Sequence, residues 1–217
     1  HDIEFLGHVV SALGVSTNPE KVRVVRDWPV PTCVGDVRSF VGLCSYYRRY
    51  VRDFAQVAAP LHRLTGKRVT FEWYDECQKA FDELKARLTS APILAMPTDD
   101  GQYILDTDAS NFSIGAVLSQ VQDAGQERVI AYASRTLKGP ELNYCATRKE
   151  LLAVAFYIKH FRPYLLGPRE FLVRTDHSAL QWLRRMPDPV GQNARWLESM
   201  EEYLPFTVQH RAGLKHG

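Results

Sequence analysis

The sequence is poor in cysteine, in net charge and in long apolar runs, and each shortage excludes a class of protein. Its four cysteines, Cys33, Cys44, Cys77 and Cys145, form no Cys-x-x-Cys pair and no cluster with histidine. We therefore expect free thiols rather than a disulfide framework or a zinc site. No run approaches the ~18 apolar residues of a membrane span, and residues 1–10 lack the features of a signal peptide. These absences predict a soluble, intracellular protein with no membrane partner.

The rest of the composition is that of an ordinary globular protein. The 217 residues are 45% hydrophobic and 24% charged, which allows one large domain or two small ones, each with a real core. The chain begins with His1 rather than Met and ends at Gly217 without an obvious terminal element. We therefore expect it to be part of a longer protein.

The formal net charge of +2 conceals an uneven distribution. Residues 18–68 hold ten basic and four acidic residues, a net +6, whereas residues 91–217 hold fourteen of each. The basic part is expected to be helical after a hairpin near Phe5–Ser11, with helices opening at Asn18-Pro19, at Asp36 and at Asp75. Proline- and glycine-rich breaks then place a domain boundary between residues 92 and 93.

The second part is predicted to alternate strands with helices. Strands are expected at Tyr103–Thr107, Ile114–Gln120, Arg128–Ser134, Phe171–Thr175 and Pro205–His210, and helices at Thr147–Tyr164, Ser178–Arg185 and Asn193–Tyr203. This order predicts an α/β fold in which a mixed five-stranded sheet carries flanking helices, after a small helical domain.

The helix that begins at Asp36 is expected to run on through an apolar stripe as far as Phe54. At 100° per residue, its opposite side carries Arg38, Gly42, Arg49 and Arg52. Arginines a turn apart can reach successive phosphates, and a glycine lets another backbone approach closely. The pattern favours a nucleic-acid-binding face on which Tyr46 could stack on a sugar or base. The alternative is a solvated surface that keeps the protein soluble.

Three carboxylates stand where strands end or helices begin. Asp108 ends the first strand of the second part, Glu150 lies just inside its first helix, and Asp176 follows its fourth strand. Each has a structural alternative: an Asx turn for Asp108, a capping box with Thr147 for Glu150, and a helix N-cap for Asp176. If the fourth strand pairs with the first, however, the three converge. Clustered carboxylates are what two-metal phosphodiester hydrolysis requires.

These segments resemble a known family. Thr107-Asp108-Ala109-Ser110, Lys149-Glu150-Leu151-Leu152 and Arg174-Thr175-Asp176-His177 look like the ribonuclease H domain of the Pol polyprotein of gypsy-type LTR retrotransposons. In the first part, Phe5-Leu6-Gly7-His8 resembles the primer grip that ends the reverse-transcriptase palm, residues 36–50 resemble the thumb, and Phe71-Glu72-Trp73 opens a segment similar to the connection. The likeness covers nearly the whole chain, in order.

The resemblance implies a reverse transcriptase that also hydrolyses the RNA strand of RNA:DNA hybrids. It implies that Asp108, Glu150 and Asp176 hold two Mg²⁺ ions, which Mn²⁺ can replace, and that His210 helps product leave. The family contacts template–primer duplex through positions that match Arg38, Gly42 and Tyr46 here, besides the primer grip at Phe5, Leu6 and Gly7. The implied partners are the hybrid, the duplex and the rest of the Pol polyprotein, with a homodimer left open. The implied location is a cytoplasmic virus-like particle or the nucleus.

Two departures from the family and one rival function accompany this interpretation. The family's fourth metal-binding Asp would lie beyond Gly217 and its polymerase aspartates before His1, so the chain alone is expected to cleave weakly or not at all and not to polymerise. The rival is a non-catalytic module whose ribonuclease H fold binds nucleic acid or partner subunits without cutting. The role of Asp106, which shares a strand face with Asp108, is left open.

Overall fold

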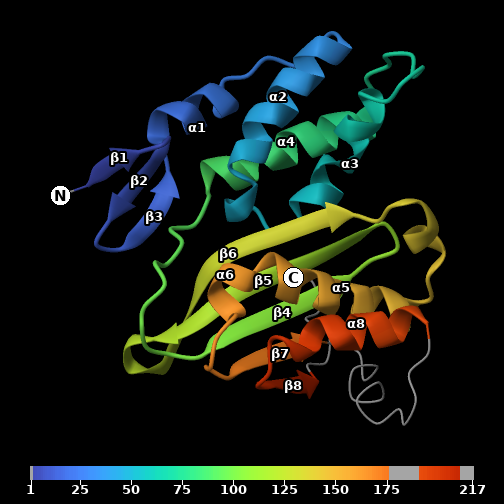
Figure 1. The fold of residues 1–217 in the computed structure, drawn as a ribbon. Coiled ribbons are helices and arrows are strands. Elements are labelled where there is room, and N and C mark those ends of the chain that lie inside the picture. Colours follow the sequence, from blue (N-terminus) through green and yellow to red (C-terminus); the bar gives the residue numbers. More distant parts are fainter. Residues whose placement is uncertain (1, 176–190, 211–217) are drawn as a thin grey trace. The chain divides into compact units, whose positions relative to one another are not determined.

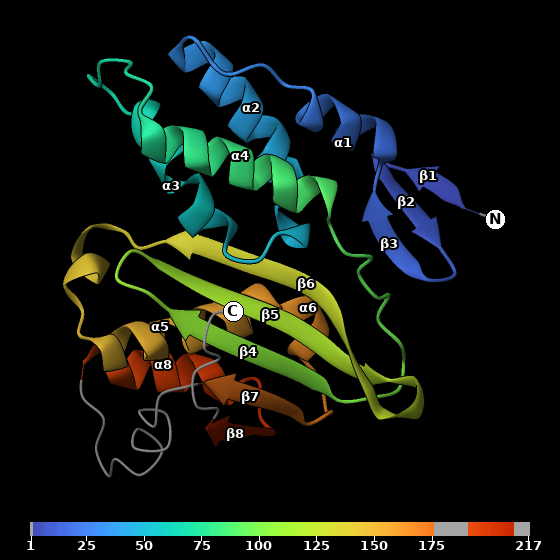
Figure 2. The same cartoon turned by 180° about the vertical axis from the view of Figure 1, so that it is seen from behind.

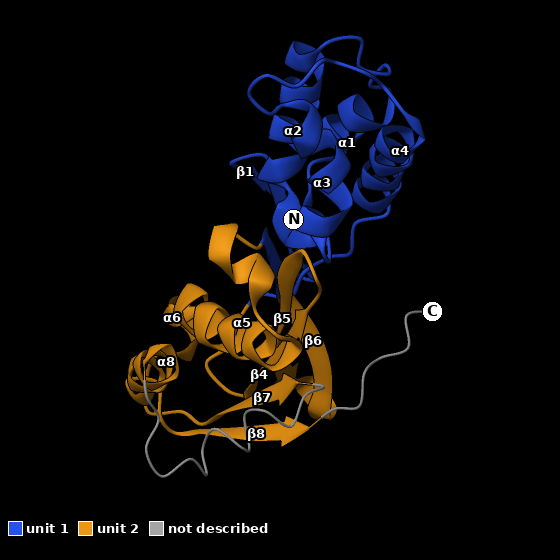
Figure 3. Cartoon of the chain, turned by 90° about the vertical axis from the view of Figure 1, so that its right-hand side faces the viewer, with its two compact units in different colours: residues 1–96, 131–136 blue, residues 97–130, 137–217 orange. Residues whose placement is uncertain are grey.

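A computed structural model describes residues 2–175 and 191–210 of the chain. The chain divides into two compact units, which are described separately here (Figure 3). Unit 1 comprises residues 1–96 with residues 131–136, and unit 2 comprises residues 97–130 and 137–217. The predicted helix at 178–185 lies outside the described residues.

Unit 1 opens with a three-stranded antiparallel sheet rather than a single hairpin. Its strands β1 (Ile3–Phe5), β2 (His8–Ser11) and β3 (Gly14–Thr17) lie in sequence order. Gly14 has a φ of +133°, and a Cβ there would lie 2.1 Å from the carbonyl oxygen of Leu94. The next residue, Val15, exchanges two backbone hydrogen bonds of 2.8 Å with Leu94. Only glycine fits at position 14, because the end of the unit returns to the sheet there.

Four α-helices complete unit 1: α1 (Pro19–Arg26), α2 (Val34–Tyr46), α3 (Phe54–Leu64) and α4 (Asp75–Thr89). The side chain of Asn18 caps α1 by accepting a hydrogen bond from the amide of Glu20 at 2.8 Å, as the Asn-Pro pair predicts. The core is aromatic and aliphatic, with Phe40 of α2 and Phe81 of α4 in ring contact at 4.5 Å. The helices lie close together (Figures 1 and 2), and their apolar stripes are buried.

The long helix predicted from Asp36 through Phe54 is wrong in its second half. Helix α2 ends at Tyr46, and a short 3-10 turn, η1 (Arg48–Tyr50), follows before α3 begins. Tyr47, just before this turn, and Tyr50, at its end, are both buried in the core of unit 1. Because α2 ends at Tyr46, the helical rotation of 100° per residue does not place Arg49 and Arg52 on the same face as Arg38.

The predicted mixed sheet belongs to unit 2, apart from residues 131–136 of its edge strand β6. Its order is β6 (Gln126–Thr136), β5 (Ser113–Gln122), β4 (Tyr103–Ala109), β7 (Phe171–Thr175) and β8 (Phe206–His210). Strand β4 is antiparallel to its neighbour β5 and parallel to its neighbour β7, and β7 is parallel to β8. This topology confirms the α/β fold with a five-stranded mixed sheet, including the pairing of its fourth strand in the chain with its first.

Helices cover one face of this sheet, as the views from the front and from behind agree (Figures 1 and 2). Among the described residues, these helices are α5 (Ala146–His160), α6 (Arg162–Leu165) and α8 (Gln192–Glu201). Two short 3-10 turns, η2 (Asp123–Gly125) and η3 (Gly139–Asn143), lie before and after β6 in the chain. Aliphatic residues such as Leu105, Leu118, Val154 and Val173 are fully buried. The burial of these apolar side chains holds the helices on the sheet.

All four cysteines are free thiols, as predicted, with Cys44 and Cys77 buried and Cys33 and Cys145 exposed. Burial raises the pKa of the Cys44 thiol to about 12, so this thiol is protonated and unreactive at neutral pH. Within the described ranges, no helix is both long enough and apolar enough to cross a membrane.

Candidate functional site

The carboxyl ends of three parallel strands meet at one edge of the unit 2 sheet. Asp106 of β4 is in register with Arg174 of β7, and Thr175 of β7 is in register with His210 of β8. Asp108, one residue before the end of β4, therefore lies at the same edge as His210, the last residue of β8. This edge is the usual place for ligand-binding residues in α/β sheets. Asp176 follows Thr175 directly in the chain and lies outside the described residues.

Helix α5 places Glu150 beside this edge. The ammonium of Lys149 donates a hydrogen bond of 3.2 Å to the carbonyl of Asn111, in the turn that follows β4. One face of the helix further along is fixed by Tyr157, whose hydroxyl donates to the carbonyl of Ile114 at 2.8 Å. Glu150 itself is only 6% exposed. The structure thus brings the first turns of α5, which include the buried Glu150, to the turn that follows β4.

The capping-box alternative for Glu150 does not hold. Helix α5 begins at Ala146 with Cys145 as its N-cap, and no side chain makes the capping hydrogen bond. Thr147 therefore lies inside the first turn of the helix. It cannot be the N-cap residue of a capping box in which Glu150 bonds back to its amide. A buried carboxylate outside a capping box needs another compensating group, such as a cation.

The turn after Asp108 is closed by a different residue. The side-chain oxygen of Ser110 accepts hydrogen bonds from the amides of Phe112 at 3.3 Å and of Ser113 at 3.0 Å, and the Ser110 amide donates to the Ser113 carbonyl at 2.8 Å. Ser110 therefore performs the task that the Asx-turn alternative assigns to Asp108. Asp108 lies one residue before the end of β4, half-buried and in register with Gly115 of β5.

Asp106 is bound by an arginine, which answers the question that the sequence leaves open. Arg174 Nε donates to Asp106 Oδ1 at 2.8 Å, and Arg174 Nη1 donates to Glu127 Oε2 at 3.0 Å. Burial lowers the pKa of Arg174, but the hydrogen bonds and charges of the two carboxylates outweigh burial and raise it well above its usual value. Asp106 is therefore the partner of a half-buried arginine.

The carboxylates at this edge have the chemistry that a hard divalent cation prefers. Asp108 and Glu150 supply oxygen donors, which Mg²⁺ and Mn²⁺ bind. Within residues 2–175 and 191–210, no group of three or more His, Cys, Asp or Glu side chains is arranged to hold a metal. The third predicted carboxylate, Asp176, lies outside those ranges, so the described part of the set comprises two donors.

In unit 1, three residues of the predicted nucleic-acid-binding face lie on α2. They are Arg38, Gly42 and Tyr46, and all three are exposed. A Cβ added to Gly42 would meet no atom within 4 Å, so the chain's own packing gives no reason for a glycine. A glycine in a helix interior costs roughly 0.5–1 kcal/mol relative to alanine. Its presence is explained if another molecule approaches the helix closely at this point.

Arg49 and Arg52 lie beyond α2 and face different neighbours. Arg49 Nε is buried and has no hydrogen-bond acceptor among the residues that the structure describes. Burial and, to a smaller extent, the charge of Arg49 lower the pKa of His8, whereas burial raises the pKa of Tyr50 to about 12 against the opposing effect of Arg49. Arg52 Nε lies 3.7 Å from Asp53. Of the three predicted arginines, only Arg38 therefore lies on α2.

His8 lies at the centre of a cluster of tyrosines that the sequence did not predict. Its ring stacks on Tyr46 at 5.4 Å and contacts the edge of Tyr47 at 5.6 Å, and its Nδ1 shares a hydrogen bond of 3.0 Å with the Tyr50 hydroxyl. The hydroxyl of Tyr46, the residue that could stack on a sugar or base, donates to the carbonyl of Leu6. The tyrosines at positions 46, 47 and 50 were the available signal, but their common target lies some 40 residues away in the chain.

His8 makes the stability of the protein depend on pH. Burial and the charge of Arg49 both lower the pKa of His8 below its usual 6.5. The folded state therefore favours the neutral ring, and this contribution is complete above about pH 6.5 and declines as the pH falls towards the folded-state pKa. We expect the wild-type chain to lose more free energy of unfolding than His8→Asn between about pH 7 and about pH 5 in urea titrations. Equal losses would contradict this, because His62, whose pKa is also lowered, is present in both proteins.

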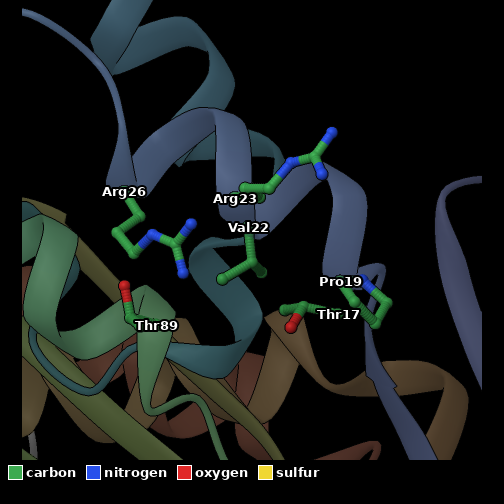
Figure 4. A pocket seen from close by; sticks show the side chains of 6 residues that line it. All are labelled: Thr17, Pro19, Val22, Arg23, Arg26 and Thr89. Carbon is green, nitrogen blue, oxygen red and sulfur yellow. The ribbon is translucent and has the colours of Figure 1, made fainter.

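A separate pocket of about 340 Å³ in unit 1 also contains arginines (Figure 4). It is lined by Thr17, Pro19, Val22, Arg23, Arg26 and Thr89. Arg26 pairs with Asp27 at 2.9 Å, and both arginines lie in the last turn of α1, where the helix dipole favours cations. These arginines therefore have a structural explanation without a ligand.

Comparison with known proteins agrees with this geometry. Residues 73–173 match the family model described as the RNase H-like domain found in reverse transcriptase. This segment is an RNase H-like domain. The chain is 40% identical over 213 residues to the retrovirus-related Pol polyprotein from transposon 297 and to that from transposon 412, both of Drosophila melanogaster. It is 36% identical to the Pol polyprotein from transposon gypsy of the same species. The resemblance to gypsy-type Pol polyproteins is confirmed.

The curated relatives are much longer than this chain. The alignments to the polyproteins of transposons 297 and 412 cover 98% of this chain but only 20% and 17% of those relatives, so the chain spans about a fifth of their length. A solved foamy viral protease-reverse transcriptase in complex with double-stranded DNA superposes with a TM-score of 0.81, at 21% identity, over 99% of this chain and 38% of that one. A second, in complex with an RNA/DNA hybrid, gives a TM-score of 0.77. These structures share the fold.

Proposed function

We propose that this chain hydrolyses the RNA strand of RNA:DNA hybrids within a retroelement Pol polyprotein that copies RNA into DNA. The observation that carries the proposal is the hydrogen bond from Lys149, at the start of α5, to Asn111, in the turn that follows Asp108 and β4. It brings the buried Glu150 and Asp108 to the same edge of the sheet. The RNase H-like family of residues 73–173 and the foamy viral protein solved with an RNA/DNA hybrid support this choice of substrate.

In this proposal, Asp108, Glu150 and Asp176 hold two divalent cations, Mg²⁺ or Mn²⁺. When bound, the cations would activate water and stabilise the leaving oxygen of a phosphodiester. The protein contributes position: the Lys149–Asn111 hydrogen bond holds Glu150 beside β4, and the pairing of Arg174 with Asp106 keeps that aspartate apart from the cations. His210, exposed at the end of β8, lies where it can contact the cleaved strand.

Unit 1 supplies duplex binding in the same proposal. Residues 1–92 would comprise the primer-grip hairpin, thumb and connection of a reverse transcriptase, and residues 93–217 the ribonuclease H domain. The exposed Arg38, Gly42 and Tyr46 on α2 would follow the duplex backbone, with Phe5, Leu6 and Gly7 at the primer strand. The rest of the Pol polyprotein is the proposed covalent partner, and a virus-like particle the proposed location.

The test uses a Pol protein that contains this chain, incubated with Mg²⁺ and a duplex whose RNA strand carries a label. We expect the RNA strand to be cut in an RNA:DNA hybrid, but not in a matched RNA duplex or as a single strand, and we expect a chelator to stop the reaction. Binding of the hybrid without any cutting would overturn the proposal. It would favour the non-catalytic module instead.

A further inference from the structure

The turn between β1 and β2 has a backbone conformation that its sequence does not favour. Leu6 has a φ of +48° and Gly7 a φ of +73°. A positive φ suits glycine but is unfavourable for leucine, whose Cβ crowds the following carbonyl. Such strain persists only where the surrounding structure imposes it, and it is concentrated at functional sites. The contacts around the turn show what imposes it.

Three tyrosines from the end of α2 and from η1 bind three consecutive residues of the turn. The hydroxyl of Tyr46 donates to the Leu6 carbonyl, and that of Tyr47 donates to the Gly7 carbonyl at 2.7 Å. The hydroxyl of Tyr50 shares the hydrogen bond of 3.0 Å with His8 Nδ1.

The same tyrosines leave little room for a side chain at the turn. A Cβ at Gly7 would lie only 3.3 Å from the Tyr46 hydroxyl oxygen and 3.5 Å from that of Tyr47. Tyr47 and Tyr50 are 1% and 2% exposed, so their rings are anchored in the core of unit 1. The turn is therefore held in one conformation by side chains that cannot easily move.

The anchored turn presents apolar side chains to solvent next to a cation. Phe5 is 64% exposed and Leu6 is 71% exposed, although both are large and apolar. Arg49 directly precedes Tyr50, the residue of η1 that bonds to His8, and Arg49 Nε lacks an acceptor among the described residues. Apolar surface beside an arginine matches a nucleic-acid strand, which offers sugar and base faces together with phosphates.

We infer that Tyr46, Tyr47 and Tyr50 are positioning residues, which hold the Leu6-Gly7-His8 turn so that Phe5 and Leu6 meet a nucleic-acid strand. The inference rests on the proposed function, because it names the side chains that set the geometry of the duplex-binding surface. It also gives Tyr46 a different role from base stacking: its hydroxyl is used within the protein.

The test removes hydroxyls and keeps the rings. Tyr46→Phe and Tyr47→Phe each delete one hydrogen bond to the turn, and Tyr74→Phe, in a tyrosine before α4, is the matched control. In the 217-residue chain, we expect amide hydrogen exchange at residues 6–8, followed by NMR, to be about fivefold faster for each lost hydroxyl. Exchange in α4 should not change, which shows that the variants are folded.

The same variants are then titrated with a fluorescently labelled RNA:DNA hybrid. We expect Tyr46→Phe and Tyr47→Phe to bind it several-fold more weakly than the wild type and Tyr74→Phe to bind it equally well. Phe5→Ser should weaken binding without faster exchange in the turn, because it alters the presented surface and not its support. Unchanged exchange in the turn, or faster exchange with unchanged hybrid binding, would overturn the inference alone. Failure of the wild-type chain to bind the hybrid would instead overturn the proposed function.

Discussion

Replacing Asp108 with Asn is expected to reduce cleavage of the RNA strand in a hybrid by more than about 100-fold, beyond the 10–100-fold typical of residues that only support a metal ligand. Asparagine has nearly the same shape as aspartate but lacks the charge that a hard cation requires. Because Ser110 closes the turn after β4, the substitution should leave the local structure intact. The rate is to be measured with Mg²⁺ in a Pol protein that contains this chain.

Asp106→Asn is the matched control, because the two aspartates share one face of the same strand. Asp106 is paired with Arg174 at 2.8 Å, so this variant should lose stability, by about 1–3 kcal/mol, and should keep most of its activity. The cost arises because the buried guanidinium retains only Glu127 as its partner. Urea titration gives the stability, and the hybrid assay gives the rate. If Asp106→Asn proved as inactive as Asp108→Asn, or if both stayed active, the assignment of the site would be wrong.

Reversing the charges of Arg38, Arg49 and Arg52 to Glu should weaken hybrid binding by at least about tenfold at low salt. Each arginine that contacts a phosphate releases counterions on binding, so the slope of log K against log salt should fall by about 2 to 3. The slope is to be measured by fluorescence titration of the 217-residue chain with a labelled hybrid at several salt concentrations. Far-UV circular dichroism would verify that the variant is folded.

A second triple variant separates this surface from overall charge. Lys21, Arg23 and Lys79 are exposed in the same unit, and their reversal to Glu changes the net charge equally. This control should keep most of the affinity and of the salt dependence. An equal loss in both triple variants would mean that long-range charge, and not the surface of α2 and the β1–β2 turn, attracts the nucleic acid.

The order of elements and the type of sheet could be predicted because they depend on local patterns. Asn18-Pro19 marked the start of α1 correctly, since an N-cap and a proline act within one helical turn. The strands of unit 2 were placed to within a few residues, since alternating and β-branched segments leave few other options. The end of α2 was not predicted. Tyr47 and Tyr50 continue an acceptable helical pattern, and only their burial in the core ends the helix at Tyr46.

The sequence by itself determined which chemical groups are present and where they lie along each element: carboxylates at strand ends, and arginines with a glycine on one helix. Only the tertiary structure distinguished Asp106 from Asp108, because the distinction depends on Arg174, which lies 68 residues away and becomes a neighbour through parallel strand pairing. Likewise, only the tertiary structure showed that the hydroxyl of Tyr46 donates a hydrogen bond to the β1–β2 turn. Hydrogen bonds and burial depend on neighbours in space, and a pattern along the chain does not specify them.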